Sequence, residues 1–213
     1  MERNNKIIVV RIAEGIGNQL FMYANSLSLC NRYNYKLLID DTSGYFKKKN
    51  RVRNFELNKF LVNFNIAENN LKFDTYFKDV KRKFLKKIDP FKQKKNFFIE
   101  ERDKKKQSSF NEIKLENYSN LVFLEGHFES ENYFKKYSKE IKENIKINND
   151  YINLDNKYVD ILKNSNSVSI CIRQNRYSEG KVKNNYKSIE FTKKTISYVN
   201  NAVKLIKNKI DNP

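Results

Sequence analysis

Apolar and polar positions at the start of the chain follow the order expected of a strand, a turn, a helix and a second strand. Residues 7–10 form a short β-branched apolar run, which predicts a buried parallel strand. A glycine-containing turn follows, after which apolar residues recur at helical spacing from Leu20 to Arg32. Residues 35–39 predict the next strand. Together these segments predict a βαβ unit with a right-handed crossover, the opening typical of nucleotide-binding α/β domains.

The pattern is weaker from about residue 46 to residue 115, where lysine clusters interrupt short apolar pieces and predict only variable helices and loops. Regularity returns at residues 121–124, which predict another strand, and Ser130 is then expected to cap a helix. The apolar face of that helix would contain Tyr133, Phe134, Tyr137, Ile141 and Ile145. A shorter helix is expected to carry Tyr158, Val159 and Leu162.

A second unit is predicted near the end of the chain. Residues 167–173 predict a strand, and Ser188 is expected to cap a long helix over residues 189–210. The apolar stripe of this helix would consist of Phe191, Thr195, Ile196, Val199, Val203, Ile206 and Ile210. A crossover helix after a parallel strand requires a further strand to cover, and the sequence ends at Pro213 before one is reached.

The overall prediction is an α/β protein in two parts. Residues 1–165 are expected to form a Rossmann-like lobe with a parallel sheet. Residues 166–213 are expected to form the first β-α unit of a second lobe, which this chain leaves truncated. We therefore expect the chain to be the N-terminal portion of a larger fold.

The charge of the chain bears on its partners. The formal net charge is +18, from 43 Lys and Arg against 25 Asp and Glu. A basic nucleic-acid-binding module would gather basic residues on one face with exposed aromatic residues between them. The periodic segments are instead expected to bury their aromatic residues, and lysine is spread over the whole chain, so we expect no nucleic acid as a partner. The charge favours anionic membrane surfaces or anionic substrates such as nucleotide sugars.

Other residue types narrow the chemistry and the compartment. His127 is the only histidine and no acidic cluster stands out, so no metal site is expected; an ordinary, partly buried histidine is the favoured interpretation. Cys30 and Cys171 lie in apolar segments that are expected to be buried, with a single disulfide left open. No stretch reaches the ~18–20 apolar residues that cross a bilayer. We expect a cytoplasmic protein, with peripheral contact to an anionic inner membrane left open.

Two places carry candidate ligand-binding residues. In the turn after the first strand, Gly15 and Gly17 would let the backbone approach a ligand, while Asn18 and Gln19 would add side-chain donors at a helix N-terminus. Because Leu20 occupies the third glycine position of the dinucleotide fingerprint, a plain tight turn is the alternative.

The second place is the carboxyl end of the strand predicted at residues 167–173. Arg173 and Arg176 stand there, where ligands bind in open α/β sheets and where a guanidinium can grip a diphosphate. An arginine that leaves the sheet for solvent is the alternative. Asp40 and Asp41 end an earlier strand, where turn capping and ligand contact are both open.

Four segments resemble one known family. The string EGIGNQLFMYANSLSL at residues 14–29 is very similar to the N-terminal signature of family 11 glycosyltransferases, the α-1,2-fucosyltransferases. RNFELNKF at 53–60 and FLEGHFESENYF at 123–134 resemble two further segments of that family. VSICIRQNRY at 168–177 stands where the family carries a His-x-Arg-Arg-Gly-Asp-Tyr motif. The resemblance therefore covers nearly the whole chain in register.

The fourth segment departs from the family motif. Cys171 stands at the His position, Gln174 at the second Arg, Asn175 at the Gly and Arg176 at the Asp, whereas Arg173 and Tyr177 are retained. The resemblance implies that the retained arginine holds the β-phosphate of the donor. Arg176 would then supply a second positive charge from a shifted position.

The resemblance implies a two-lobed, GT-B-like enzyme without a metal or other cofactor. The N-terminal lobe would contribute mainly to the acceptor side, and the C-terminal lobe would bind GDP-fucose. Fucose would pass with inversion to a galactose 2-hydroxyl in glycan or lipopolysaccharide synthesis. Arg173 is the expected catalytic residue, and the expected donor-binding residues are Arg173, Arg176, Tyr177, Gly15, Gly17, Asn18 and Gln19. The alternatives are an inactive or fragmentary remnant of such an enzyme and a basic nucleic-acid-binding module.

Overall fold

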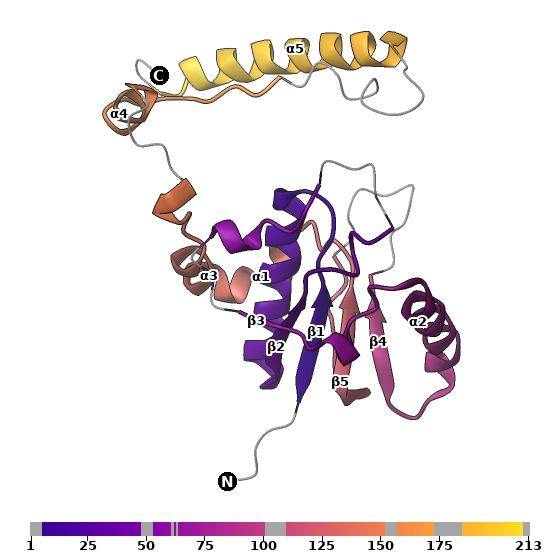
Figure 1. Ribbon diagram of the computed structural model, residues 1–213. Helices are drawn as coiled ribbons and strands as arrows, with labels where there is room; N and C mark the ends of the chain where they lie inside the picture. Colours follow the sequence, from indigo (N-terminus) through magenta and orange to yellow (C-terminus); the bar gives the residue numbers. More distant parts are fainter. Residues whose placement is uncertain are drawn as a thin grey trace. The chain divides into compact units, whose positions relative to one another are not determined.

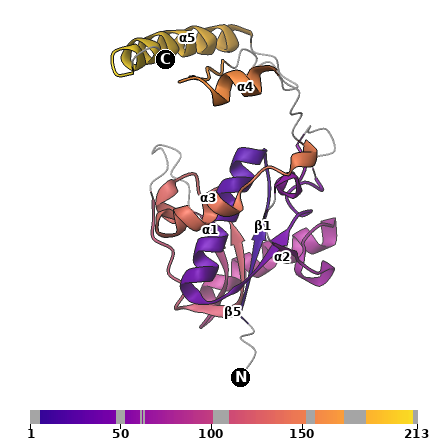
Figure 2. The ribbon, with the colours of Figure 1, turned by 90° about the vertical axis from the view of Figure 1, so that its left-hand side faces the viewer.

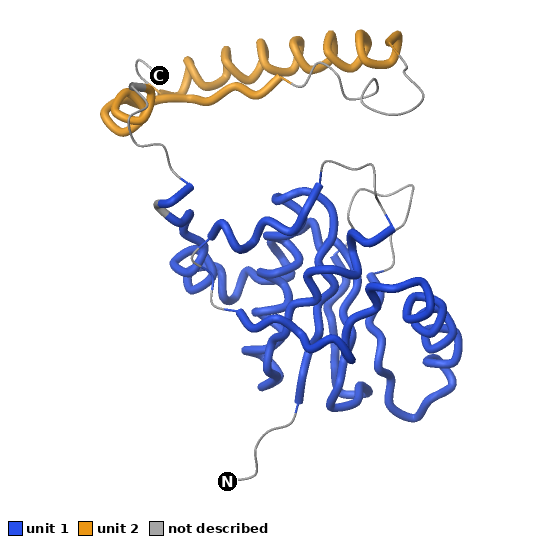
Figure 3. Tube along the Cα trace, viewed as in Figure 1, with its two compact units in different colours: residues 1–152 blue, residues 153–213 orange. Residues whose placement is uncertain are grey.

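A computed structural model describes residues 6–47, 53–60, 62, 64–100, 110–151, 157–172 and 185–210. The chain divides into two compact units, Met1–Ile152 and Asn153–Pro213, coloured separately in Figure 3. The sequence placed this division between residues 165 and 166, so that a short helix assigned to the first lobe belongs instead to the second unit.

The first unit is built on a five-stranded parallel sheet in the order β3-β2-β1-β5-β4 (Figure 1). Its strands are β1 Ile7–Arg11, β2 Lys36–Asp40, β3 Asn65–Ile66, β4 Lys95–Ile99 and β5 Tyr118–Glu125. The three strands that the sequence predicted for this unit are confirmed, and they lie side by side as β2, β1 and β5. The α/β class with a parallel sheet is therefore confirmed.

Helices cover both faces of this sheet. The α-helices of the first unit are α1 Ile16–Tyr33, α2 Tyr76–Ile88 and α3 Ser138–Asn144. Short 3₁₀ turns occupy Leu57–Lys59, Asn69–Leu71, Asp89–Phe91, Glu131–Tyr133, Lys135–Tyr137 and Asn149–Tyr151. Figure 2 shows α3 beside α1, where the Asn31 side chain donates to the carboxylate of Glu140.

The helix predicted from Ser130 to Ile145 is not continuous, which corrects the sequence analysis. The Ser130 hydroxyl does accept a hydrogen bond from the amide of Asn132, as expected of a cap. Phe134 then leaves the helical region at φ −133°, and two 3₁₀ turns precede α3. The ring of Phe134 packs against Phe21 of α1 with 6.0 Å between centroids. Aromatic packing against α1 therefore accompanies the break in the helix.

Alternate residues of the central strands build two apolar layers. Ile8, Val10, Ile39 and Val122 pack with Tyr23 of α1 in the larger core cluster. The opposite face holds a smaller cluster whose buried members are Val9, Leu38 and Ala67. Burial on both faces explains why β1 is a continuous β-branched run rather than an alternating one.

The second unit contains α4 Lys157–Lys163 and α5 Asn185–Lys207. The long helix predicted at the end of the chain is confirmed, but it begins at Asn185, so Ser188 lies inside it and is not its cap. Residues 166–172 form no strand, and their side chains are exposed. The predicted strand is therefore wrong for this segment. A parallel strand needs a neighbour to accept its backbone hydrogen bonds, and the described residues of this unit offer none. Cys171 is exposed rather than buried, while Cys30 is buried as predicted, and both thiols are free.

Gly44 lies in a close approach that leaves no room for a side chain. A Cβ added there would stand 2.0 Å from the carbonyl oxygen of Ile12, whereas one added at Gly17 would meet nothing within 4 Å. We expect Gly44→Ala to lower the free energy of unfolding in urea by about 1–3 kcal/mol, the usual cost of overpacking. Gly17→Ala is the matched control and should leave stability unchanged or raise it by up to about 1 kcal/mol. Equal unfolding midpoints for Gly44→Ala and the parent would contradict this close approach.

Candidate functional site

The candidate site lies at the carboxyl ends of β1 and β5, which are neighbours in the sheet (Figure 1). The turn before α1 follows β1, and the loop 126–130 follows β5. Ligands of open α/β sheets bind outside the carboxyl ends of the strands.

Gln19 holds the turn after β1 from the inside. Its side chain is fully buried, and its Nε2 donates to the carbonyl oxygens of Glu14 at 2.9 Å and Asn54 at 2.8 Å. Its Oε1 accepts from the backbone amide of Glu56 at 2.9 Å. The expected direct contact between this side chain and a donor does not fit its burial. Gln19 instead positions the turn and joins it to residues 54–56.

Backbone geometry at this turn is unusual. Glu14 adopts a left-handed conformation at φ 64°, which is uncommon outside glycine. Its carboxylate accepts from Nη1 of Arg53 at 2.9 Å, and its carbonyl oxygen accepts from the hydroxyl of Tyr45 at 3.4 Å. Contacts from separate segments therefore hold one strained residue. Strain of this kind is concentrated at functional sites, so it supports a ligand-binding role for the turn.

Gly15 and Gly17 open one side of α1 to a ligand. Gly15 is the extended N-cap residue of α1 and makes no side-chain cap bond. Gly17 borders open space, since a Cβ added there would meet nothing within 4 Å, and the neighbouring Asn18 is partly exposed. The first amides of a helix have no intrahelical acceptor and attract anions. This turn can therefore accept a phosphate or a sugar hydroxyl.

The loop after β5 is fixed by Glu100, which lies just after β4. Its carboxylate accepts from the backbone amide of His127 at 2.7 Å and from that of Phe128 at 3.1 Å. Phe128 is fully buried and left-handed at φ 52°. A Cβ at Gly126 would come within 2.5 Å of the Cβ of Glu100. The loop is thus closely packed, and it sets the position of His127.

Polar side chains from three segments meet around the turn. Nδ1 of His127 lies 3.5 Å from Nδ2 of Asn18 and 3.5 Å from a carboxylate oxygen of Glu129. The Arg53 guanidinium lies near Gly15, with its Cζ 3.9 Å from the position that a Cβ at residue 15 would occupy. Arg53 and His127 can donate to phosphate or sugar oxygens, and a neutral His127 can accept a proton.

Sequence reasoning did not single out Arg53, and it favoured an ordinary role for His127. Both residues fall inside 53–60 and 123–134, two of the segments on which the sequence analysis based its expected family. That coincidence was the available signal. It could not be used without knowing that these segments meet the turn after β1.

The other predicted site residues have different outcomes. Arg173, Arg176 and Tyr177 lie in residues 173–184, outside the described residues, so their expected roles stay predictions. The carboxylate of Asp40 accepts from the amides of Thr42 and Ser43, and Asp41 pairs with Lys72 at 2.7 Å. Of the alternatives left open for the two aspartates, these contacts fit turn capping and structural pairing.

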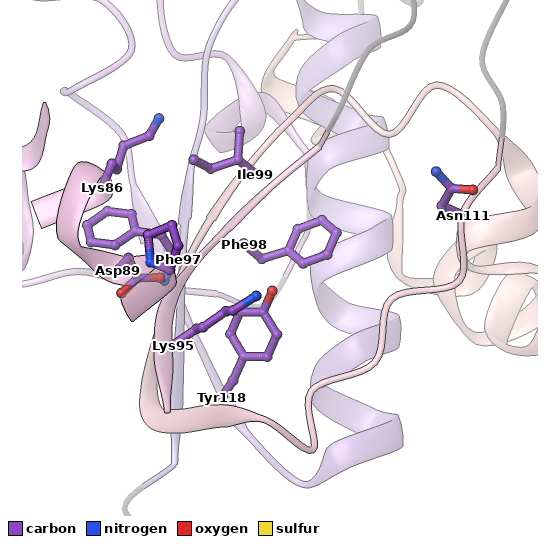
Figure 4. A pocket seen from close by; sticks show the side chains of 9 residues that line it. Lys86, Asp89, Lys95, Phe97, Phe98, Ile99, Asn111 and Tyr118 are labelled. Atoms are coloured by element: carbon purple, nitrogen blue, oxygen red, sulfur yellow. The ribbon is translucent and has the colours of Figure 1, made fainter. Parts of the chain in front are cut away.

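A pocket of about 290 Å³ lies beside the edge strand β4, away from this turn (Figure 4). Its lining residues are Lys86, Asp89, Pro90, Lys95, Phe97, Phe98, Ile99, Asn111 and Tyr118. The Asp89 carboxylate accepts from the amides of Asn96 and Phe97 at 2.9 Å, and Lys86 donates to Glu125 at 2.8 Å. Because these charged groups already serve the fold, the pocket is a weaker candidate.

Over the described ranges, no group of three or more His, Cys, Asp and Glu side chains could hold a metal ion. Among the helices that the structure describes, none combines the length and the apolar character needed to span a membrane. Comparisons with protein-family models, with curated proteins and with solved structures find no match for this chain.

Proposed function

We propose that the protein is a metal-independent glycosyltransferase of the α-1,2-fucosyltransferase type, which transfers fucose from GDP-fucose to a galactose 2-hydroxyl. The observation that supports this proposal is that segments distant in the sequence contact one another at a single place in the fold. Three of the four segments that resemble the family lie apart in the sequence and meet at the carboxyl ends of β1 and β5.

Each meeting point is a specific contact. Glu14 and Arg53 are 39 residues apart and form an ion pair. Gln19 and Glu56 are 37 residues apart and share a hydrogen bond. Asn18 and His127 are 109 residues apart, with 3.5 Å between their side-chain nitrogens. Chance likeness in three unrelated segments gives no reason for them to contact one another, whereas a shared site does.

The proposed chemistry needs stabilisation of a leaving diphosphate and positioning of an acceptor hydroxyl. Arg173 is assigned to the diphosphate, where a guanidinium fork binds phosphate oxygens and stabilises the charge that grows in the transition state. The open backbone at Gly15 and Gly17 is assigned to the approach of the donor, with Asn18 donating beside it. Gln19 acts as a positioning residue. The reaction is assigned to the cytoplasm, in glycan or lipopolysaccharide synthesis.

Disruption of the gene in its source organism tests whether the natural protein performs the proposed reaction. Linkage analysis of the cell-surface glycans should show loss of 2-substituted galactose and of terminal fucose attached to it. Reintroduction of the parent gene should restore both. Unchanged fucose linkages after disruption, with the transcript shown to be absent, would contradict the proposed reaction.

Gly17→Ala separates function from stability at the turn. Because a Cβ at this position meets nothing within 4 Å of the protein, the variant should fold at least as well as the parent. The added methyl would occupy space assigned to the ligand, and we expect fucose transfer to fall about tenfold, a loss typical of a misplaced contact. Asn31→Ala, at the other end of α1, is the matched control and should transfer normally. Equal transfer by both variants would show that no ligand approaches Gly17.

A further inference from the structure

Helix α2 turns an apolar ridge toward solvent. Phe77 is 90% exposed, Val80 64% and Phe84 60%, and these residues follow one another at helical spacing along one side. Phe91, in the 3₁₀ turn that follows, is 89% exposed. A surface helix of a globular protein normally packs such a stripe against its core. Here the stripe is left outside.

Ion pairs hold the opposite face of α2 against the protein. Asp79 is buried and pairs with Lys47 and with Arg82, and Arg82 and Lys86 both pair with Glu125 of β5. Burial opposes ionisation of Asp79, but Lys47 and Arg82 outweigh it and hold the pKa of this carboxyl well below its usual range. Turning the ridge inward would break these pairs. The outward orientation is therefore built into the fold.

Within α2, the exposed charged side chains are all lysines. Lys81, Lys83 and Lys87 are exposed along α2 beside the ridge. Between residues 75 and 95 the acidic side chains are Asp79 and Asp89, and both are buried. The outward surface of α2 thus combines aromatic and aliphatic groups with lysines and presents no carboxylate from this stretch.

We propose that α2 and Phe91 form a docking surface for anionic lipid bilayers, in which Phe77, Val80 and Phe84 enter the interface. A basic amphipathic helix with Phe or Leu on its apolar side lies in the plane of a membrane, and nearby lysines are attracted to an anionic leaflet. The proposal rests on the surface of α2 and does not depend on the proposed reaction. The net charge already favoured contact with anionic membranes, and this proposal assigns that contact to α2.

Two other occupants fit this surface less well. Exposed aromatics between lysines were the sequence criterion for a nucleic-acid binder, and α2 meets it, against the expectation that the aromatics are buried. Single strands, however, bind in grooves where bases stack on platforms, whereas the apolar side chains of α2 form a convex ridge with a valine in it. Protein interfaces are depleted in lysine, which borders this ridge. A flat, anionic and apolar partner matches it best.

The chain contains no tryptophan, so one placed in the ridge reports its surroundings without background. With vesicles of phosphatidylglycerol and phosphatidylcholine, the fluorescence of Phe84→Trp should shift to shorter wavelength, and with phosphatidylcholine alone it should not. Tyr151→Trp, at an exposed site of the first unit remote in sequence, is the control and should show no shift with either vesicle. An unshifted Phe84→Trp spectrum with anionic vesicles would overturn the proposal.

Vesicle sedimentation separates the ridge from general charge. Lys81→Glu with Lys87→Glu, and separately Phe77→Ser with Phe84→Ser, should weaken binding about tenfold or more. Lys139→Glu with Lys142→Glu on α3 changes the net charge equally and should weaken it far less. Equal loss from both lysine pairs would assign binding to the overall charge and overturn the proposal. The proposal would also be overturned if vesicles do not bind the parent and the parent instead binds a single-stranded oligonucleotide or forms a concentration-dependent dimer. In either case the Phe77→Ser, Phe84→Ser variant would abolish that interaction.

Discussion

Replacement of Arg173 by lysine is expected to reduce fucose transfer by roughly 100-fold or more, the loss typical of removing a principal transition-state contact. Under the proposed function, Arg173 is the basic residue assigned to the donor diphosphate. A lysine keeps the positive charge but loses the guanidinium fork, which binds two phosphate oxygens at once. In the proposed reaction, negative charge grows on the leaving phosphate, so the transition state would depend on that contact more than the ground state does.

The measurement is the rate of transfer by the protein purified from its source organism, with GDP-fucose saturating and with folding checked by circular dichroism. Arg176→Lys is the comparison and should lose less, since Arg176 is assigned an auxiliary contact. If Arg173→Lys keeps a near-normal rate and nucleotide affinity, Arg173 is an arginine exposed to solvent and the site assignment fails.

Glu125→Gln is expected to lower the free energy of unfolding by about 3–5 kcal/mol, as is usual when one partner of a buried ion pair is removed. Its carboxylate accepts from Nη1 of Arg82 at 2.7 Å and from Nζ of Lys86 at 2.8 Å, and its side chain is 12% exposed. The substitution would replace the carboxylate that Arg82 and Lys86 share with a neutral amide, while Arg82 keeps its pair with Asp79. Urea denaturation measures the change. Glu140→Gln, an exposed glutamate on α3, is the control and should change stability by less than about 1 kcal/mol.

The same carboxylate makes stability depend on pH. Burial raises the pKa of Glu125, but Arg82 and Lys86 outweigh it, so the pKa lies below the ordinary glutamate value. A lowered pKa means that the stabilisation is present in full above the unfolded-state pKa and is lost as the pH falls through the folded-state pKa. Acid unfolding of the parent should therefore include a component that Glu125→Gln lacks. A parallel fall in stability for both proteins below pH about 4 would contradict this role.

The sequence predicted the centre of the sheet but not its edges, for physical reasons. β1, β2 and the apolar part of β5 are buried on both faces, so they read as continuous apolar runs. The edge strand β3 has two exposed residues, and β4 mixes Lys95 and Asn96 with its apolar residues. Edge strands bury less and carry a weaker apolar signal. Helix α2 falls in the range for which the sequence predicted only variable helices and loops, because lysines interrupt its apolar residues along the chain.

The candidate site was predictable only in part. Glycines in a turn after a strand carry a local signal, which correctly placed the backbone at Gly15 at the start of a helix. Arg53 and His127 come from distant segments, and their approach to that turn is set by Gln19 and Glu100 through backbone hydrogen bonds. Gln19 was predicted to contact a ligand because the residues that bury it, Asn54 and Glu56, lie far away in the sequence. Local pattern alone does not contain such contacts.

Transfer of radiolabelled fucose tests the central claim most directly. The protein purified from its source organism is incubated with GDP-fucose and a β-galactoside in the presence of a metal chelator, and the linkage of the product is determined by nuclear magnetic resonance. We predict an α-linked fucose on the galactose 2-hydroxyl, formed with inversion. A folded protein that transfers no fucose from GDP-fucose to any galactoside, or that forms a different linkage, would contradict the proposed function.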